Sequence, residues 1–138
     1  MGFRRKSREL ALQMLFQLDV NSDGPNWRKQ FWALHPAPAE VKTFAEQLVD
    51  GVLEHKEEID HLIQKHAVNW TINRMSIIDR NILRCAVYEL MRLSDIPAKV
   101  TMNEAIEIAK RYSDEESGAF VNGILDHIVK EEFFAKKE

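Results

Sequence analysis

Cysteine is nearly absent from this sequence: Cys85 stands alone among 138 residues, so no internal disulfide can form. Its place in the apolar run 82–87 predicts a buried thiol in a reducing, cytoplasmic setting. The five histidines include no pair four residues apart, the spacing that sets two imidazoles on one helical face, so we predict no metal site. The five scattered glycines form no phosphate-binding loop, and no serine lies in a nucleophile elbow. We therefore predict a protein without cofactor or catalytic activity.

Long apolar runs are also missing, and no stretch reaches the length of a membrane-spanning helix. Glycine and proline are few, at 5 and 4 residues, and no segment alternates for long with the period of a strand. With 45% hydrophobic and 30% charged residues, the composition is that of a globular protein. The chain has the length of one ordinary domain, so we predict a single all-α domain over residues 1–138.

Apolar residues recur with helical spacing over most of the chain and predict about seven helices. The expected helices cover residues 3–19, 27–34, 40–54, 59–68 and 76–93, then 101–112, and a last one after the acidic turn 113–117. Ser76 is a candidate N-cap, and the spacing from Thr101 to Glu104 predicts a capping box. Near residue 76 we expect a division into two small packed helical subdomains.

A basic cluster opens the first predicted helix, although the net charge of the chain is −3. Its members are Arg4, Arg5, Lys6 and Arg8. Cations in a first turn oppose the helix dipole, so stability alone does not account for them. The spacing directs the three arginines toward one side of the helix, and guanidinium groups suit phosphates. The cluster favours a local polyanion site, and a solvated basic terminus is the alternative.

Two phenylalanines could complete a site for single-stranded RNA, which proteins hold by stacking unpaired bases beside cationic contacts. Phe16 lies two turns beyond Arg8, and Phe120 lies in the last predicted helix; core packing is the alternative for both. Gly123 interrupts the apolar pattern of that last helix, where glycine is less favourable than alanine. The glycine indicates a close approach of another helix or of a ligand.

Several segments resemble the NusB family of transcription antitermination factors, in that family's order and spacing. The resemblance begins in the basic first helix and continues through the central and last helices, over about residues 4–130. The segments that carry it are 4–17, 78–84, 86–90, 95–97, 103–110 and 120–126.

The resemblance implies an all-helical, NusB-like RNA-binding fold and a set of partners. These partners are boxA-type RNA of ribosomal RNA leader transcripts, the ribosomal protein that serves as NusE, and RNA polymerase with NusA and NusG. At position 16 the family often has tyrosine, so Phe16 keeps the stacking face and loses the hydroxyl, and at position 116 the family often has aspartate where this chain has Glu116. Carried over by position, the resemblance implies NusE contact by Asp79 and RNA contact by Arg4, Arg5, Lys6, Arg8, Phe16, Glu116 and Phe120.

Two other interpretations remain open. One is a stand-alone relative of the NusB-like domain of ribosomal RNA cytosine methyltransferases, although the sequence holds no glycine-rich cofactor domain and no catalytic cysteine motif. The other is a helical scaffold that binds only protein, for which the basic cluster would be dispensable. In segment 21–39, Trp27 and Trp32 indicate satellite core packing or, if exposed, a dimer contact. The sequence is compatible with a monomer and with a homodimer.

Overall fold

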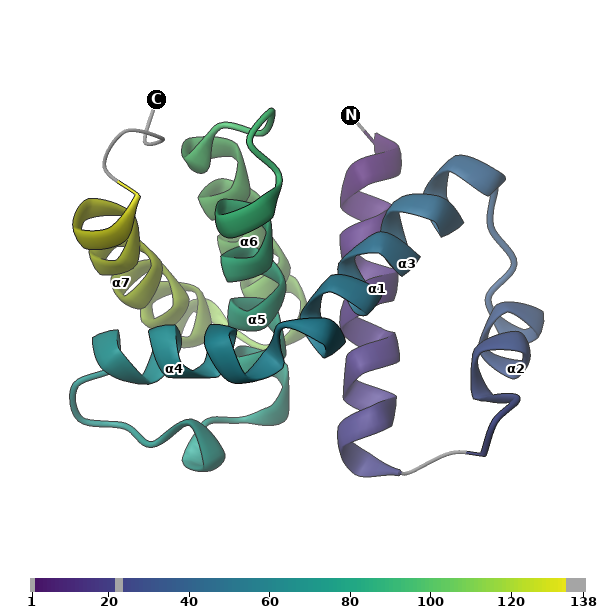
Figure 1. The fold of residues 1–138 in the computed structure, drawn as a ribbon, viewed down its shortest axis with the longest axis horizontal. Coiled ribbons are helices and arrows are strands. Elements are labelled where there is room, and N and C mark those ends of the chain that lie inside the picture. Colours follow the sequence, from purple (N-terminus) through teal and green to yellow (C-terminus); the bar gives the residue numbers. More distant parts are fainter. Residues whose placement is uncertain (1, 22–23, 134–138) are drawn as a thin grey trace.

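The computed structural model describes residues 2–21 and 24–133, which form seven α-helices and one 3-10 turn. These elements are α1 (Gly2–Val20), α2 (Trp27–Leu34), α3 (Ala39–Glu54), α4 (Lys56–His66), η1 (Ile72–Arg74), α5 (Ile77–Arg92), α6 (Ala98–Tyr112) and α7 (Glu115–Glu132). No strand occurs in these ranges, so the all-α prediction is confirmed. In Figure 1, α1, α2 and α3 occupy one side of the molecule and α4 to α7 the other, with α3 crossing in front of α1.

Five of the other helices pack around α5, which contacts α1, α3, α4, α6 and α7. Residues 81–90 of α5 are all buried. Buried apolar side chains from both sides of the molecule form one continuous cluster, and Cys85 lies within it as predicted. Burial raises the pKa of the Cys85 thiol to about 12. The expected division near residue 76 falls in the turn between η1 and α5 and stays a prediction.

Two glycines on helices have opposite surroundings. A Cβ added to Gly51 would lie 2.2 Å from the ring of Tyr88, so glycine there lets α3 cross closely over α5. Around Gly123 no described atom lies within 4 Å of the corresponding position, apart from its chain neighbours and the backbone of its own helix. Close approach of another helix therefore does not account for Gly123. Of the two explanations that the sequence suggested, the close approach of a ligand is the one that remains.

The helix starts confirm one predicted cap and correct another. Ser76 caps α5, because the N–H of Asp79 donates to its hydroxyl oxygen at 3.0 Å. The capping box at Thr101 is wrong, since α6 begins earlier, at Ala98, directly after Pro97. Pro97 is the N-cap residue, with an extended backbone, and its missing N–H would have had no partner within the helix.

The tryptophan segment packs against the core rather than projecting from it. Trp32 is buried, and its Nε1–H donates to a carboxylate oxygen of Glu46 at 2.7 Å. Trp27 is half-buried against the same apolar cluster. The satellite-packing interpretation is therefore confirmed.

A buried ion pair joins α1 to α5. The Arg8 guanidinium donates to both carboxylate oxygens of Glu89, at 2.7 and 2.9 Å, and the two residues are only 6% and 1% exposed. The hydroxyl of Thr101 donates to the same carboxylate at 3.0 Å, which brings α6 into the contact. Three helices therefore share one buried carboxylate.

Removing the cation of this pair should strongly destabilise the protein, because the Glu89 carboxylate would stay buried without its main partner. We expect Arg8→Ala to lower the free energy of unfolding by about 3 kcal/mol or more, measured by urea denaturation. The matched control is Arg5→Ala, which removes an arginine from an exposed ion pair and should cost less than about 1 kcal/mol. Equal losses in the two variants would contradict a structural role for the buried pair.

Candidate nucleic-acid interface

The three clustered arginines of α1 have different main partners in the structure. Arg8 turns inward to Glu89, while Arg4 turns toward α3 and places its guanidinium 4.7 Å from the ring centroid of Phe44. Arg5 is exposed and points toward α6. All three side chains still line one hollow, as their spacing predicted, but Asp95 and Glu104 line it with them, so it is not a purely basic surface.

Polar contacts bridge α1 to α6 along the exposed side of α1. The Arg5 guanidinium donates to both carboxylate oxygens of Glu104, each at 2.8 Å. Further along the two helices, Arg111 donates to Glu9 at 3.0 Å and Gln13 donates to the Tyr112 hydroxyl at 3.3 Å. Since partners further along α1 meet partners further along α6, the two helices run in the same direction.

Glu104 occupies the place that a phosphate would take on Arg5. The hydrogen bond from Arg5 lowers the pKa of the Glu104 carboxyl, and the bond to Glu104 raises the pKa of Arg5. Both groups are therefore charged at neutral pH, and the pair lies at the surface. Such an exposed pair is weak enough for a competing anion to exchange with it.

Lys6 and Phe16 are exposed on α1 as Arg5 is, and the three residues define one broad exposed stripe, with Lys6 about 100° around the helix from Arg5. Lys6 is exposed and forms no ion pair with the described residues. Phe16 follows Arg5 by eleven residues, which is about three full helical turns and returns to the same line on the helix. Its side chain is 38% exposed and lines a hollow with Gln13, Phe31, His35 and Tyr112, among others. One stripe of α1 thus presents two cations at one end and an aromatic ring at the other.

The start of α7 lies at the same end of the molecule as Phe16. Tyr112, in the hollow beside Phe16, is the last residue of α6, and α7 begins three residues later. Glu116 is exposed in the first turn of α7, where its charge is also favourable for the helix dipole. Phe120, one turn further, is half-buried. The structure therefore sets Phe16 and Phe120 at one end of the molecule without bringing them into contact.

Asp79 is engaged within the protein. Its carboxylate accepts a hydrogen bond from the Ser117 hydroxyl, which ties the start of α5 to the start of α7. The cap of α7 adjoins this link, because the N–H of Ser117 donates to Asp114 at 2.8 Å. Asp79 is half-buried, so part of it still faces outward. Its contact with a protein partner stays a prediction.

Two residues of this region have surroundings that the sequence did not predict. Glu104 was interpreted as part of a cap and is instead the partner of Arg5. Trp70 lies between α4 and η1, where no periodicity reports burial, and its side chain is 51% exposed. A large aromatic residue in the short connection 67–71 was the available signal for Trp70.

Two further predictions concern features that the described residues lack. In the ranges 2–21 and 24–133, no group of three or more histidine, cysteine or acidic side chains could hold a metal ion. Within the same ranges, every helix is too short or too polar to cross a bilayer.

Comparisons with known proteins agree over nearly the whole chain. The NusB family profile matches residues 5–130. A transcription antitermination protein NusB from Thermodesulfovibrio yellowstonii is 46% identical over 145 residues, which covers 97% of this chain and 96% of the relative. The T. maritima NusB structure has a TM-score of 0.82 and 43% identity, covering 93% of this chain and 91% of that one.

A crystal structure of the antitermination factors NusB and NusE in complex with dsRNA is also similar. It has a TM-score of 0.83 and 32% identity, and covers 94% of this chain and 98% of the other. The names of these relatives describe transcription factors, which supports the prediction of a non-catalytic protein. The family profile and the identity over almost the full length together show that this chain belongs to the NusB family of transcription antitermination proteins.

Proposed function

We propose that this protein binds boxA-type RNA of ribosomal RNA leader transcripts together with NusE, and acts in the cytoplasm in an antitermination complex with RNA polymerase, NusA and NusG. Family membership supports this role, as does the related structure in which NusB and NusE are in complex with dsRNA. The observation that carries the RNA-binding part is the exposed stripe of α1, with Arg5 and Lys6 at one end and Phe16 at the other.

Each proposed site residue receives a role that fits its surroundings. Arg5 and Lys6 contact phosphates, and Arg4 adds positive charge beside them from its place on Phe44. Phe16 stacks an unpaired base. Arg8 is too buried to reach RNA without leaving Glu89, so the geometry favours a positioning role for it over direct contact.

The start of α7 contributes a second set of contacts in this proposal. Phe120 stacks another base, and the Glu116 carboxylate beside it repels phosphates, which weakens binding to RNA that gains no stacking. Asp79 faces NusE, a basic ribosomal protein that acidic side chains attract. The net charge of −3 makes RNA binding by this chain alone weak, so NusE strengthens it.

A scaffold that binds only protein is the alternative, and it predicts that the stripe on α1 is dispensable. The methyltransferase alternative is disfavoured, because the relatives that this chain spans almost completely are named antitermination proteins.

Removing the two exposed cations should weaken RNA binding without unfolding the protein. For Arg5→Ala with Lys6→Ala, we expect a loss of affinity for single-stranded boxA-type RNA and a salt slope shallower by about 1.4, as for two phosphate contacts. Fluorescence anisotropy at several salt concentrations, with and without NusE, measures both quantities. The control is Lys29→Ala with Lys56→Ala, which removes the same charge from exposed sites on α2 and α4.

The two outcomes that count against this proposal are distinct. Equal affinity in the double variant and the wild type would remove the stripe from the RNA site. If the wild type bound no RNA even with NusE, the RNA-binding function itself would be wrong.

Glu104→Gln should act in the opposite direction, because it frees Arg5 and removes a carboxylate from the phosphate path. We expect tighter RNA binding, by about threefold, and a small loss of stability, because Glu104 also lies 3.8 Å from the buried Arg8 guanidinium. The matched control is Glu107→Gln, which removes the same charge one turn further along α6, from a residue that pairs with Lys110 instead. An equal gain in both variants would show that only overall charge matters, and that Glu104 does not compete for Arg5.

A further inference from the structure

Trp70 presents an exposed indole from a loop that is held in place. The side-chain amide of Gln64 donates to the carbonyl oxygen of Trp70 at 2.6 Å and accepts from the N–H of Ile72 at 2.7 Å. The N–H of Trp70 itself donates to the carbonyl of Ala67 at 3.2 Å. One amide therefore fixes the backbone on both sides of an indole that is 51% exposed. An apolar ring held in water on an ordered loop is preorganised for a contact outside the chain.

A shallow groove separates this loop from α7. Its walls and floor include Val68, Trp70, Ala119, Phe120, Gly123 and His127. The rings of Trp70 and Phe120 meet edge to face, with centroids 5.7 Å apart. Together, the two rings form one end of the groove.

Gly123 leaves the floor of the groove bare. Glycine in a helix interior is less favourable than alanine, and no described atom comes within 4 Å of the place where a Cβ would stand. Packing inside the protein therefore does not call for glycine at this position. The bare backbone of α7 leaves room for a flat group to lie beside Trp70.

The charge of the groove favours a nucleobase over a basic peptide. None of the described residues that line it carries a carboxylate, whereas the hollow beside Arg5 includes Asp95 and Glu104. At the other end of the groove, Nδ1 of His127 lies 2.6 Å from Nδ1 of His66, which fixes the His127 ring. A basic protein partner would find no opposite charge in this lining, while a neutral aromatic ring would find faces on which to stack.

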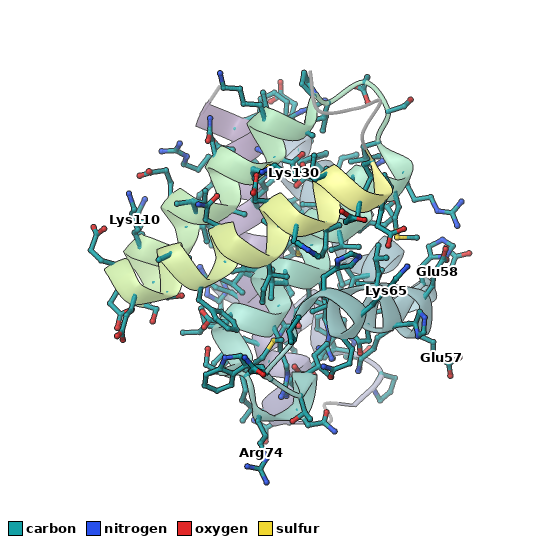
Figure 2. All side chains as sticks on the ribbon, turned by 90° about the vertical axis from the view of Figure 1, so that its left-hand side faces the viewer. Glu57, Glu58, Lys65, Arg74, Lys110 and Lys130 are labelled. Carbon is teal, nitrogen blue, oxygen red and sulfur yellow. The ribbon has the colours of Figure 1, made fainter. Side chains whose placement is uncertain are left out.

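An exposed cation lies near Trp70 in the sequence and could contact the phosphate next to a bound base. Arg74 follows Trp70 by four residues, is exposed, and forms no ion pair with the described residues. Figure 2, which looks onto α7, shows its side chain projecting outward from the end of the molecule opposite Lys130. Aromatic faces beside an accessible guanidinium are the combination that single-stranded RNA binds.

We propose that this groove binds one unpaired base of the RNA, stacked on Trp70 and lying over Gly123. The inference rests on the proposed RNA-binding function and deepens it. Phe120 belongs both to the proposed RNA contacts and to the wall of the groove, so the RNA path continues from the start of α7 onto the loop that carries Trp70. Arg74 contacts a phosphate beside the bound base.

Three variants test the groove with a short single-stranded boxA-type RNA that carries 2-aminopurine at successive positions, in the presence of NusE. Trp70→Leu should weaken binding by about fivefold or more and abolish the quenching of 2-aminopurine at one position. Trp70→Phe keeps an aromatic face and should retain most of the affinity and the quenching.

Gly123→Ala separates binding from folding, because the two effects have opposite signs. The added methyl group should raise the Tm by about 3 °C, since alanine favours the helix, and should weaken RNA binding by obstructing the floor of the groove. As a control, Leu34→Ala truncates another exposed apolar side chain, on α2, and should leave RNA binding unchanged.

The results that would reject base binding in the groove differ from those that would reject the proposed function. Wild-type affinity and quenching in Trp70→Leu and Gly123→Ala, with binding still lost on removal of Arg5 and Lys6, would reject the groove and leave the α1 site standing. Weaker binding of NusE in the absence of RNA, with unchanged RNA affinity, would assign the groove to the protein partner and equally reject the proposal. Failure of the wild type to bind RNA with NusE would reject both proposals.

Discussion

The buried ion pair between Arg8 and Glu89 determines which face of α1 is exposed to solvent and to binding partners. A helix is a rigid cylinder of side chains, so fixing one residue inward fixes the direction of every other residue on it. With Arg8 turned to α5, Arg5 points to α6, Arg4 reaches Phe44, and Lys6 faces water. Ser7 adds to this constraint, because its hydroxyl donates to the carbonyl of Val41 on α3. One internal contact therefore selects the cations that RNA could meet.

The far end of α1 is held by a second polar network, also built on α5. Asp19 accepts hydrogen bonds from Asn81 at 2.9 Å and from Arg80 and Arg84 at 3.2 Å. Burial alone would raise the pKa of Asp19, but the bond from Asn81 and the two guanidinium charges hold that pKa below its usual value. Arg84 also binds both carboxylate oxygens of Asp60 on α4. Because polar contacts with α5 hold α1 near both of its ends, α1 is rigid and fixes the spacing between Arg5 and Phe16.

Buried polar groups of this kind do little for stability compared with an apolar core, because removing charges from water is costly. Their geometric demands are stricter, since a guanidinium and a carboxylate tolerate few orientations. Arg8 and Glu89 would lose both hydrogen bonds if α1 rotated by one residue, whereas apolar contacts could readjust. The pair therefore specifies the rotation of α1 more sharply than hydrophobic packing could.

These networks also explain what could and could not be predicted from the sequence. Helix positions follow from apolar periodicity, and four of the seven α-helices lie within one residue of where that pattern places them, while α4, α6 and α7 each begin three residues earlier than expected. The direction of each arginine depends on carboxylates far along the chain, such as Glu89 for Arg8 and Glu104 for Arg5, and no local pattern reports such pairing. A buried arginine looks like a surface residue in any hydropathy pattern. The resemblance to the NusB family supplied the candidate site residues, and the structure divides them into exposed and buried groups.

Carboxylates beside the cations allow this surface to discriminate among RNAs. A chain with net charge −3 gains little from long-range attraction, and Glu104 already neutralises Arg5, so phosphate contact alone must displace an existing partner. An RNA held only by its backbone therefore binds weakly. An RNA that can also place unpaired bases on Phe16 and Phe120 gains stacking energy that does not depend on charge. The carboxylates weaken the electrostatic contribution to binding, which is available to every RNA. They leave the stacking contribution unchanged, and only RNAs with suitably placed unpaired bases obtain it. Selectivity in this arrangement arises from that difference.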